Sequence, residues 1–187
     1  MQHQTSELAL LRTQINPHFL FNTLNNIYSL VYQKSGDAPE ALMKLSDIMR
    51  YMLYDTSSDK VLLEKEIRYL KSFVELQTLR LKSKDFVVFE ITGDPSGKII
   101  APMLLIPFVE NAFKHGNKAA PSPGIVIKMH CTANLFTFSV KNKKNMSGAK
   151  DSLGGIGLTN VKRRLELIYH ENYTLDILDN EDNFEIT

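Results

Sequence analysis

Hydrophobic residues recur every three or four positions over residues 1–82, which is the spacing of one face of an α-helix. Three helices are predicted, separated by a turn at residues 36–39 and a polar stretch at residues 56–59. Pro17 interrupts the first helix and should bend its axis. The helical stripes are Leu8, Leu11, Ile15, Phe19, Asn22, Asn26 and Leu30, then Leu42, Leu45, Ile48, Met49 and Met52, then Leu63, Ile67, Leu70, Val74, Gln77 and Leu81.

From residue 85 onward the pattern changes to alternation and short apolar runs. Residues 102–115 predict a helix that is apolar nearly all round and therefore buried, and residues 157–169 predict an amphipathic helix. The polar residues 141–153 predict a long loop. Strands are predicted at residues 86–91, 124–130, 135–140, 173–178 and 184–186, the second and third forming an antiparallel hairpin. This order predicts an α+β fold with a helical region (1–82) and an α/β sandwich with a mixed sheet (83–187).

Composition narrows the class of protein. Lys and Arg number 22 against 21 Asp and Glu in 187 residues, so no charge excess points to nucleic acid or an anionic membrane. Cys131 is the single cysteine, which excludes an intramolecular disulfide and indicates a reducing compartment; a small buried strand residue is expected there. The longest apolar run, residues 99–109, is too short to span a membrane. Both ends interrupt predicted elements, so we expect a fragment, truncated at its C-terminus.

The first chemically informative segment is residues 14–26. His18 and Asn22 are four residues apart and therefore share a helix face. A neutral imidazole offers a nucleophilic nitrogen near neutral pH, as a phosphoryl acceptor requires, and the preceding proline helps to present the ring. The alternative is a histidine packed at a helix–helix seam, with the asparagines fixing helix register.

The second segment, residues 107–116, ends the predicted buried helix with a cluster of polar groups, which are costly to bury unpaired and should line a cleft. The Asn111 carboxamide oxygen can complete the shell of Mg²⁺, while Lys114 and His115 can reach phosphate oxygens. Glu110 can polarise a nucleophile or orient a metal-bound water. The alternative is an ordinary polar C-terminal turn, in which basic residues favour the helix dipole and Gly116 ends the helix.

The third segment, residues 154–160, places glycines directly before a helix. Glycine lets the backbone approach a phosphate, and the N–H groups of a first helical turn bind anions. A short glycine-rich turn is weak evidence by itself, and both the Walker signature and the strand–turn–helix unit of a dinucleotide fold are missing.

These three segments, in this order, resemble those of the LytS/YehU-type sensor histidine kinases. Residues 16–22 (Asn-Pro-His-Phe-Leu-Phe-Asn) are similar to their acceptor-histidine motif. Residues 110–116 are similar to the N box of the wider GHKL ATP-binding superfamily, and residues 155–165 to its glycine box. The resemblance extends from about residue 8 to the end of the chain, and it favours the nucleophile interpretation of His18.

The resemblance implies a Bergerat-type α/β sandwich that binds ATP and Mg²⁺, and a homodimer formed through the N-terminal helices. Phosphate would pass from ATP to His18, and then to an aspartate on the receiver domain of a response regulator. Such a kinase acts on the cytoplasmic side, in a parent protein of the inner membrane, through a fragment that does not itself span it. Carried over by position, Asn111 would ligate Mg²⁺, and the nucleotide would contact Lys114, His115, Asn142, Gly155, Gly157, Leu158 and Asn160.

Two departures from the family pattern matter. Asn142 stands where the superfamily has the aspartate that holds the adenine amino group, which removes charge assistance worth about 1 kcal/mol. Lys141, Lys143 and Lys144 are expected to compensate by attracting the triphosphate. Phe19 follows the acceptor histidine where many histidine kinases have an acid, so Glu110 is the candidate base.

Two other functions remain open at this point. One is a catalytically weak dimeric regulatory scaffold with little nucleotide binding, which the asparagine at position 142 and the glycine-poor loop favour. The other is an ATPase of the same superfamily that releases phosphate instead of phosphorylating itself.

Overall fold

A computed structural model describes residues 17–81, 83–144 and 156–187. The helices lie at α2 (Pro17–Tyr32), α3 (Ala38–Tyr54), α4 (Leu63–Thr78), α5 (Ile106–His115) and α6 (Ile156–Tyr169), with short 3-10 turns at Asp55–Ser57 and Lys84–Phe86. The strands lie at β1 (Val61–Leu62), β2 (Val87–Gly93), β3 (Ile99–Ile100), β4 (Ile125–Cys131), β5 (Phe136–Lys143), β6 (Ile177–Asp179) and β7 (Asn183–Ile186).

The main sheet has five strands in the order β2-β4-β5-β7-β6. β2 and β4 are parallel, because the chain crosses over through α5 between them, and the other neighbours are antiparallel. β4 buries every second residue, from Ile125 through Ile127 and Met129 to Cys131, as expected of a strand with one face against a core. The mixed sheet, the hairpin β4–β5 and the buried position of Cys131 are thus confirmed.

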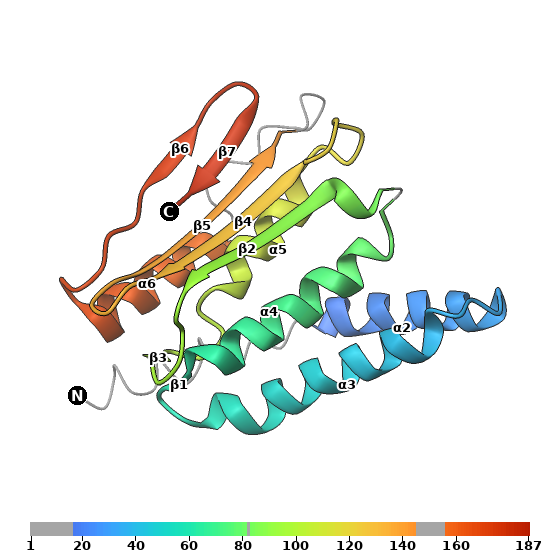
Figure 1. Cartoon of the computed structure of the whole chain (residues 1–187), viewed down its shortest axis with the longest axis horizontal. Helices are drawn as coiled ribbons and strands as arrows, with labels where there is room; N and C mark the ends of the chain where they lie inside the picture. The colour runs from blue at the N-terminus through green and yellow to red at the C-terminus, as the bar shows by residue number, and fades with distance from the viewer. Residues whose placement is uncertain (1–16, 82, 145–155) are drawn as a thin grey trace.

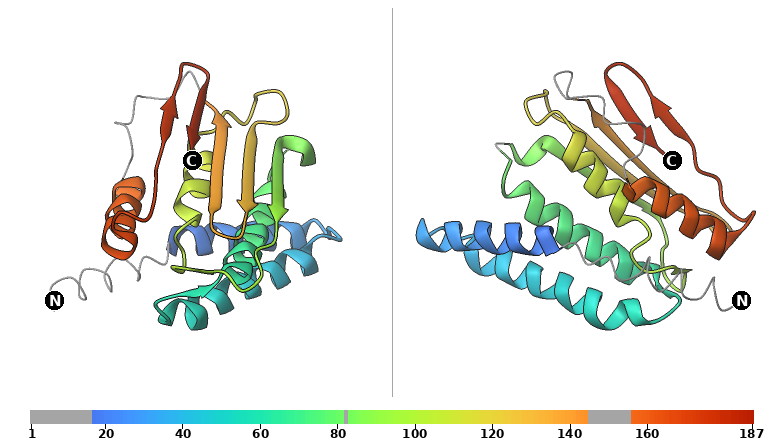
Figure 2. Two further views of the ribbon diagram at one scale, coloured as in Figure 1. Left: turned by 60° about the vertical axis from the view of Figure 1, so that its left-hand side comes forward. Right: turned by 180° about the vertical axis from the view of Figure 1, so that it is seen from behind.

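Helices cover one face of this sheet. α4, α5 and α6 lie side by side on it, and the hairpin of α2 and α3 lies beyond α4 (Figures 1 and 2). One continuous core runs through all of these layers. Phe73 of α4 forms its centre, 4.9 Å in ring-centroid distance from Phe19 of α2 and 6.1 Å from Phe113 of α5. The helical region and the sandwich therefore share one interior, and the division at residue 82 stays a prediction.

The backbone differs from the sequence prediction in four places. One is β6, which begins at Ile177, four residues later than the strand predicted at residues 173–178. Residues 61–62 form a strand paired with residues 99–100, within the region predicted as helical. α5 begins at Ile106, four residues later than expected, because Met103 has a φ of 53°, outside the right-handed helical region. Residues 141–143 continue β5, since β4 and β7 both pair with them, instead of opening the predicted loop. The remainder of that loop lies outside the described residues, as does the expected bend before Pro17.

Candidate functional site

The last turn of α5 is joined to the end of β5 by backbone hydrogen bonds. The Asn117 N–H donates to the Lys143 carbonyl at 2.7 Å, and Gly116 forms an isolated antiparallel bridge with Lys144. The Lys143 N–H in turn donates to the Gly124 carbonyl at 2.9 Å. The N-box segment at the end of α5 and the segment around Asn142 at the end of β5 are therefore neighbours. The sequence predicted a functional role for each of them.

Gly116 has no room for a side chain at this junction. An added Cβ would lie 2.5 Å from the Ala112 carbonyl oxygen and 3.8 Å from the Cβ of Asn142. The first distance is far inside van der Waals contact. The short distance is to a carbonyl group of α5 itself, so the glycine permits the tight end of this helix, which agrees with the helix-ending role that its position indicated.

Asn142 is buried, with 2% of its surface exposed. It lies in β5 between Ile125 of β4 and Phe184 of β7, and its Nδ2 atom donates to the Lys143 carbonyl at 3.4 Å. This distance is near the upper limit for a hydrogen bond, so the bond is weak.

α5 presents its polar residues next to a buried face. Glu110, Asn111 and His115 are half-buried and Lys114 is exposed. Burial is the main cause of a strongly raised pKa at Tyr69 of α4, and the charge of Glu110 is the next. The Glu110 carboxylate therefore lies close enough to α4 for its charge to act on the Tyr69 hydroxyl.

α6 packs against α5, as Figure 2 shows from behind. Leu158 is buried, Asn160 is half-buried and Gly157 is exposed. A Cβ added to Gly157 would meet no protein atom within 4 Å. No packing contact with the described residues therefore requires a glycine at position 157. Gly155, the other predicted glycine of this segment, lies outside the described residues.

His18 belongs to the first turn of α2, and its side chain lies outside the described part of the structure. Its neighbour Phe19 is 9% exposed and contacts Phe73, which in turn contacts Phe113 between Asn111 and Lys114 of α5. The acceptor-histidine helix and the N-box helix are therefore packed against the same α4 ring.

The three lysines on either side of Asn142 bind other groups of the protein. Lys141 pairs with Glu185 at 3.5 Å, and the Lys143 Nζ donates to the Pro121 carbonyl at 2.9 Å. Lys144 forms a 2.7 Å salt bridge with Asp179 of β6. Their expected role in attracting a triphosphate receives no support from these contacts.

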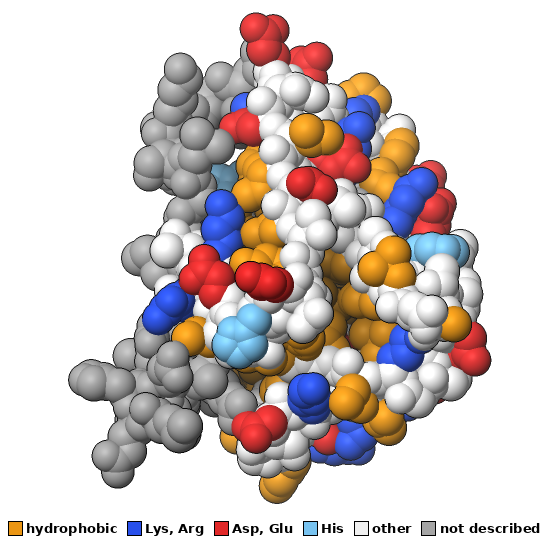
Figure 3. Space-filling view, turned by 90° about the vertical axis from the view of Figure 1, so that its left-hand side faces the viewer, with side chains coloured by type: hydrophobic (Ala, Val, Ile, Leu, Met, Phe, Trp, Pro, Cys, Tyr) orange, Lys and Arg blue, Asp and Glu red, His pale blue; other side chains and the backbone are white. Residues whose placement is uncertain are grey.

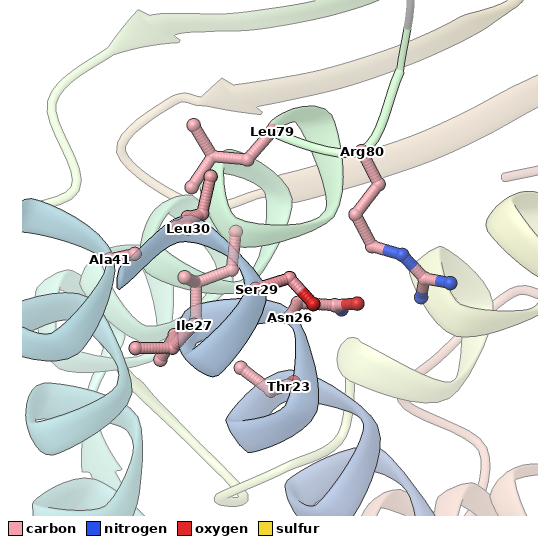
Figure 4. A pocket seen from close by; sticks show the side chains of 9 residues that line it. Thr23, Asn26, Ile27, Ser29, Leu30, Ala41, Leu79 and Arg80 are labelled. Carbon is pink, nitrogen blue, oxygen red and sulfur yellow. The ribbon is translucent and has the colours of Figure 1, made fainter. Parts of the chain in front are cut away.

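A small cavity of about 160 Å³ lies between α2, α3 and α4, beside the acceptor-histidine segment (Figure 4). Asn26 and Ser29 line it, and the Arg80 side chain extends from the end of α4 on the same side. Ligand pockets usually measure about 300–1,000 Å³, so this cavity is too small for a nucleotide.

A larger cavity of about 790 Å³ lies beside the stretch of β5 that pairs with β4 alone. Figure 3 shows hydrophobic side chains on the floor of this hollow. Its walls include Leu105, Phe108, Phe136 and Phe138 and none of the residues predicted to bind nucleotide. Leu165, the last residue of the segment that resembles the glycine box, lines this hollow, but no residue of the N-box segment does.

Within the described ranges, no group of three or more His, Cys, Asp or Glu side chains could hold a metal ion. A divalent cation at Asn111 would thus need oxygens from the nucleotide and water. This is how Mg²⁺ is commonly held in phosphoryl-transfer sites, so the donor set fits Mg²⁺ brought with a triphosphate.

Two buried charges escaped the sequence interpretation. Glu66 of α4 is 0% exposed and Arg164 of α6 is 4% exposed. A signal for both was present: Glu66 lies three residues after Leu63 and four before Leu70, and Arg164 lies three after Val161. Each charge thus occupies a position on the apolar helix face.

A five-stranded mixed sheet covered on one face by helices, with the end of α5 joined to the end of β5, agrees with the α+β fold expected of the ATP-binding domain of a histidine kinase. The histidine kinase family model matches residues 6–85. Sensor protein LytS of Staphylococcus saprophyticus is 29% identical over 185 residues, which cover 92% of this chain and 31% of that protein. Sensor histidine kinase YpdA of Escherichia coli K12 is 31% identical over 177 residues, with 89% and 31% covered.

These matches show that the chain belongs to the LytS-type sensor histidine kinases, a family of two-component signalling. The chain spans about a third of the length of these curated relatives. A solved structure of a bacterial phosphotransferase has a TM-score of 0.51 at 9% identity, covers 100% of this chain and 95% of that chain, and supports the fold alone. None of the described helices combines the length and hydropathy needed to cross a bilayer.

Proposed function

We propose that this chain is an ATP-dependent autokinase that phosphorylates His18 and passes the phosphoryl group to an aspartate of a response regulator. The observation that carries the proposal is the junction of α5 with β5, which gathers the N box and Asn142 beside α6. Membership of the histidine kinase family supports the same reaction.

Each predicted residue has a role in this proposal. Asn111 would hold Mg²⁺, which supplies charge neutralisation at the phosphates when bound. Lys114 and His115 would contact phosphate oxygens, and the first N–H groups of α6 at Gly157 and Leu158 would bind them as a helix N-terminus does. The Asn142 carboxamide oxygen would accept from the adenine amino group, and Asn160 would line the same site.

In the reaction, a lone pair of the neutral His18 imidazole attacks the γ-phosphorus. The P–N bond forms as the P–O bond to the β-phosphate breaks and ADP leaves, and the ring N–H proton passes to a base. Glu110, half-buried on α5, is the candidate for that base. The main contribution of the protein is positioning and charge stabilisation.

A homodimer is part of the proposal, because α2 and α3 expose large hydrophobic side chains. These are Phe21, Leu24, Tyr28, Val31 and Tyr32 on α2, and Leu42, Met43, Met49, Leu53 and Tyr54 on α3. Contiguous exposed apolar patches mark interaction sites, and a second copy of the same hairpin offers a matching surface.

Labelling with γ-labelled ATP and Mg²⁺ tests the proposal. Acid-labile phosphate should appear on the wild type, disappear in His18→Gln and persist in His130→Gln, the control at an exposed histidine of β4. A labelled aspartate should then appear on an added receiver domain. Equal labelling of His18→Gln and the wild type would exclude His18, and steady phosphate release from His18→Gln would instead favour an ATPase.

A regulatory scaffold with little nucleotide binding is the second candidate. The burial of Asn142 favours it, because only 2% of the surface of this residue is exposed and an adenine ring would have little of it to contact. Calorimetry with Mg-ATP separates the two. Binding supports the kinase, whereas no binding at millimolar nucleotide favours the scaffold.

A further inference from the structure

The segment of residues 101–105, directly before α5, is held by a buried carboxylate. The two oxygens of Glu66 accept from the backbone of this segment, at 2.9 Å from the Met103 N–H and 3.2 Å from the Leu105 N–H. Glu66 is fully buried, and burial raises its pKa, while these hydrogen bonds and the charge of Arg164 oppose that rise. The irregular backbone at Met103 thus obtains from a side chain the partners that a helix would supply.

Arg164 of α6 holds the same segment through its carbonyl groups. Its Nη1 donates to the Met103 carbonyl at 3.0 Å and its Nη2 to the Pro102 carbonyl at 2.7 Å. Tyr169, also of α6, accepts from the Ala101 N–H at 2.9 Å. The segment is therefore fixed between α4, which accepts from two of its N–H groups, and α6, which donates to two of its carbonyl groups and accepts from a third N–H group.

The helical hairpin joins this network through Tyr51 of α3. Its hydroxyl donates to the same Glu66 oxygen that accepts from Met103. Burial, and then the charge of Glu66, raises the pKa of Tyr51, so the phenol keeps its proton and remains a donor. One carboxylate thus contacts α3 and the start of α5 at once, and Arg164 adds α6.

Stability alone does not explain why charged side chains such as Glu66 and Arg164 are buried at this position. Burying a carboxylate costs several kcal/mol, and a well-packed apolar group often stabilises an interior equally well. What the Tyr51–Glu66–Arg164 network provides is a fixed geometry between elements, because each hydrogen bond restricts direction and distance. The elements it fixes are the two helices of the proposed nucleotide site and the hairpin that carries His18.

We propose that Tyr51, Glu66 and Arg164 form a positioning clamp that sets α5 and α6 relative to the α2–α3 hairpin, and so transmits movements of the hairpin to the nucleotide site. The inference rests on the proposed kinase function. Tyr51 is the link to the hairpin, whereas Glu66 and Arg164 hold the nucleotide-site helices together. Phosphoryl transfer is sensitive to misplacement of its reactants by about 1 Å, which gives such a clamp control over the rate.

Tyr51→Phe is the decisive variant, because it removes only the hydroxyl and leaves both backbone bonds of Glu66 in place. Ile48→Val is its matched control, a small loss at a 0% exposed position on the same helix. In Tyr51→Phe, Mg-ADP affinity should stay within about twofold of wild type, while His18 phosphorylation at saturating ATP falls about tenfold or more. In Ile48→Val, both should stay within about twofold.

Glu66→Gln should weaken nucleotide binding as well, because glutamine keeps one acceptor oxygen but its NH₂ group cannot accept from the second backbone N–H group. Amide hydrogen exchange of residues 101–106 gives a readout independent of catalysis, and should accelerate in Glu66→Gln and remain unchanged in Ile48→Val. Equal effects of Tyr51→Phe and Ile48→Val on the phosphorylation rate, or unchanged exchange in Glu66→Gln, would overturn the clamp. A wild type that neither binds Mg-ADP nor labels His18 would overturn the proposed function instead.

Discussion

Gly116, directly after α5, forms an isolated antiparallel bridge with Lys144, directly after β5, so that the ends of these two elements are neighbours. Neither residue is close to the other in sequence. The bridge brings the N-box segment next to the strand end that carries Asn142, and the consequences of disturbing it can be measured.

Gly116→Ala should destabilise the protein and weaken nucleotide binding together. The new Cβ would lie 2.5 Å from the Ala112 carbonyl oxygen, and overpacking of this kind costs about 1–3 kcal/mol in the free energy of unfolding. Urea denaturation and Mg-ADP calorimetry measure the two effects. Gly36→Ala, where an added Cβ meets nothing within 4 Å, is the control and should leave both unchanged or raise stability slightly. Equal stability of the two variants would contradict the packing argument.

Gly157→Ala should separate binding from stability. The added methyl group meets no protein atom within 4 Å, and alanine is the better helix former, so stability should stay the same or rise by up to about 1 kcal/mol. If the glycine serves close approach of a phosphate to the backbone, Mg-ADP affinity should fall about tenfold. Unchanged affinity in calorimetry would show that no phosphate approaches this position.

The buried Glu66 should make stability decline with pH above the ordinary carboxyl range. Its pKa in the folded chain is raised from 4.5, so the native state retains a proton that the unfolded state releases. Stability therefore falls as pH rises from about 4.5 through the folded pKa, by up to about 1.4 kcal/mol per pH unit, and then levels off. The groups acting on this carboxylate are the Tyr51 hydroxyl and the Arg164 guanidinium, neither of which changes charge in this range.

Thermal or urea unfolding of wild type and Glu66→Gln across pH 4.5–8 isolates this contribution, because all other titrating groups are common to both proteins. The stability difference, wild type minus variant, should decrease with rising pH. A constant or increasing difference would mean that burial does not dominate the pKa of Glu66.

The exposed apolar face of α2 and α3 should control self-association. Leu24→Asp places a charge in the proposed interface and should raise the dimer dissociation constant about tenfold or more. Leu178→Asp on β6 is the matched control, since Leu24 is 48% exposed and Leu178 is 59% exposed. Analytical ultracentrifugation distinguishes them, and a dimer lost equally in both variants, or in neither, would place the interface elsewhere.

Much of this architecture was predictable from local pattern. The three N-terminal helices, the β4–β5 hairpin and α6 follow from apolar spacing, because burial of one face dictates a period of about two or 3.6 residues. The motifs around His18, Asn111 and Gly157 were recognisable because family motifs are contiguous in sequence.

The tertiary structure alone decided how these segments meet. The α5–β5 junction depends on backbone pairing of residues 116–117 with residues 143–144 that no spacing encodes, and β5 runs through Lys143 because β4 and β7 pair with it. Glu66 and Arg164 stood on apolar helix faces in the sequence, but their partners are backbone groups 37 to 62 residues away. Helical periodicity reports which side of an element is buried, whereas the partner across the interface is fixed only when the whole chain packs.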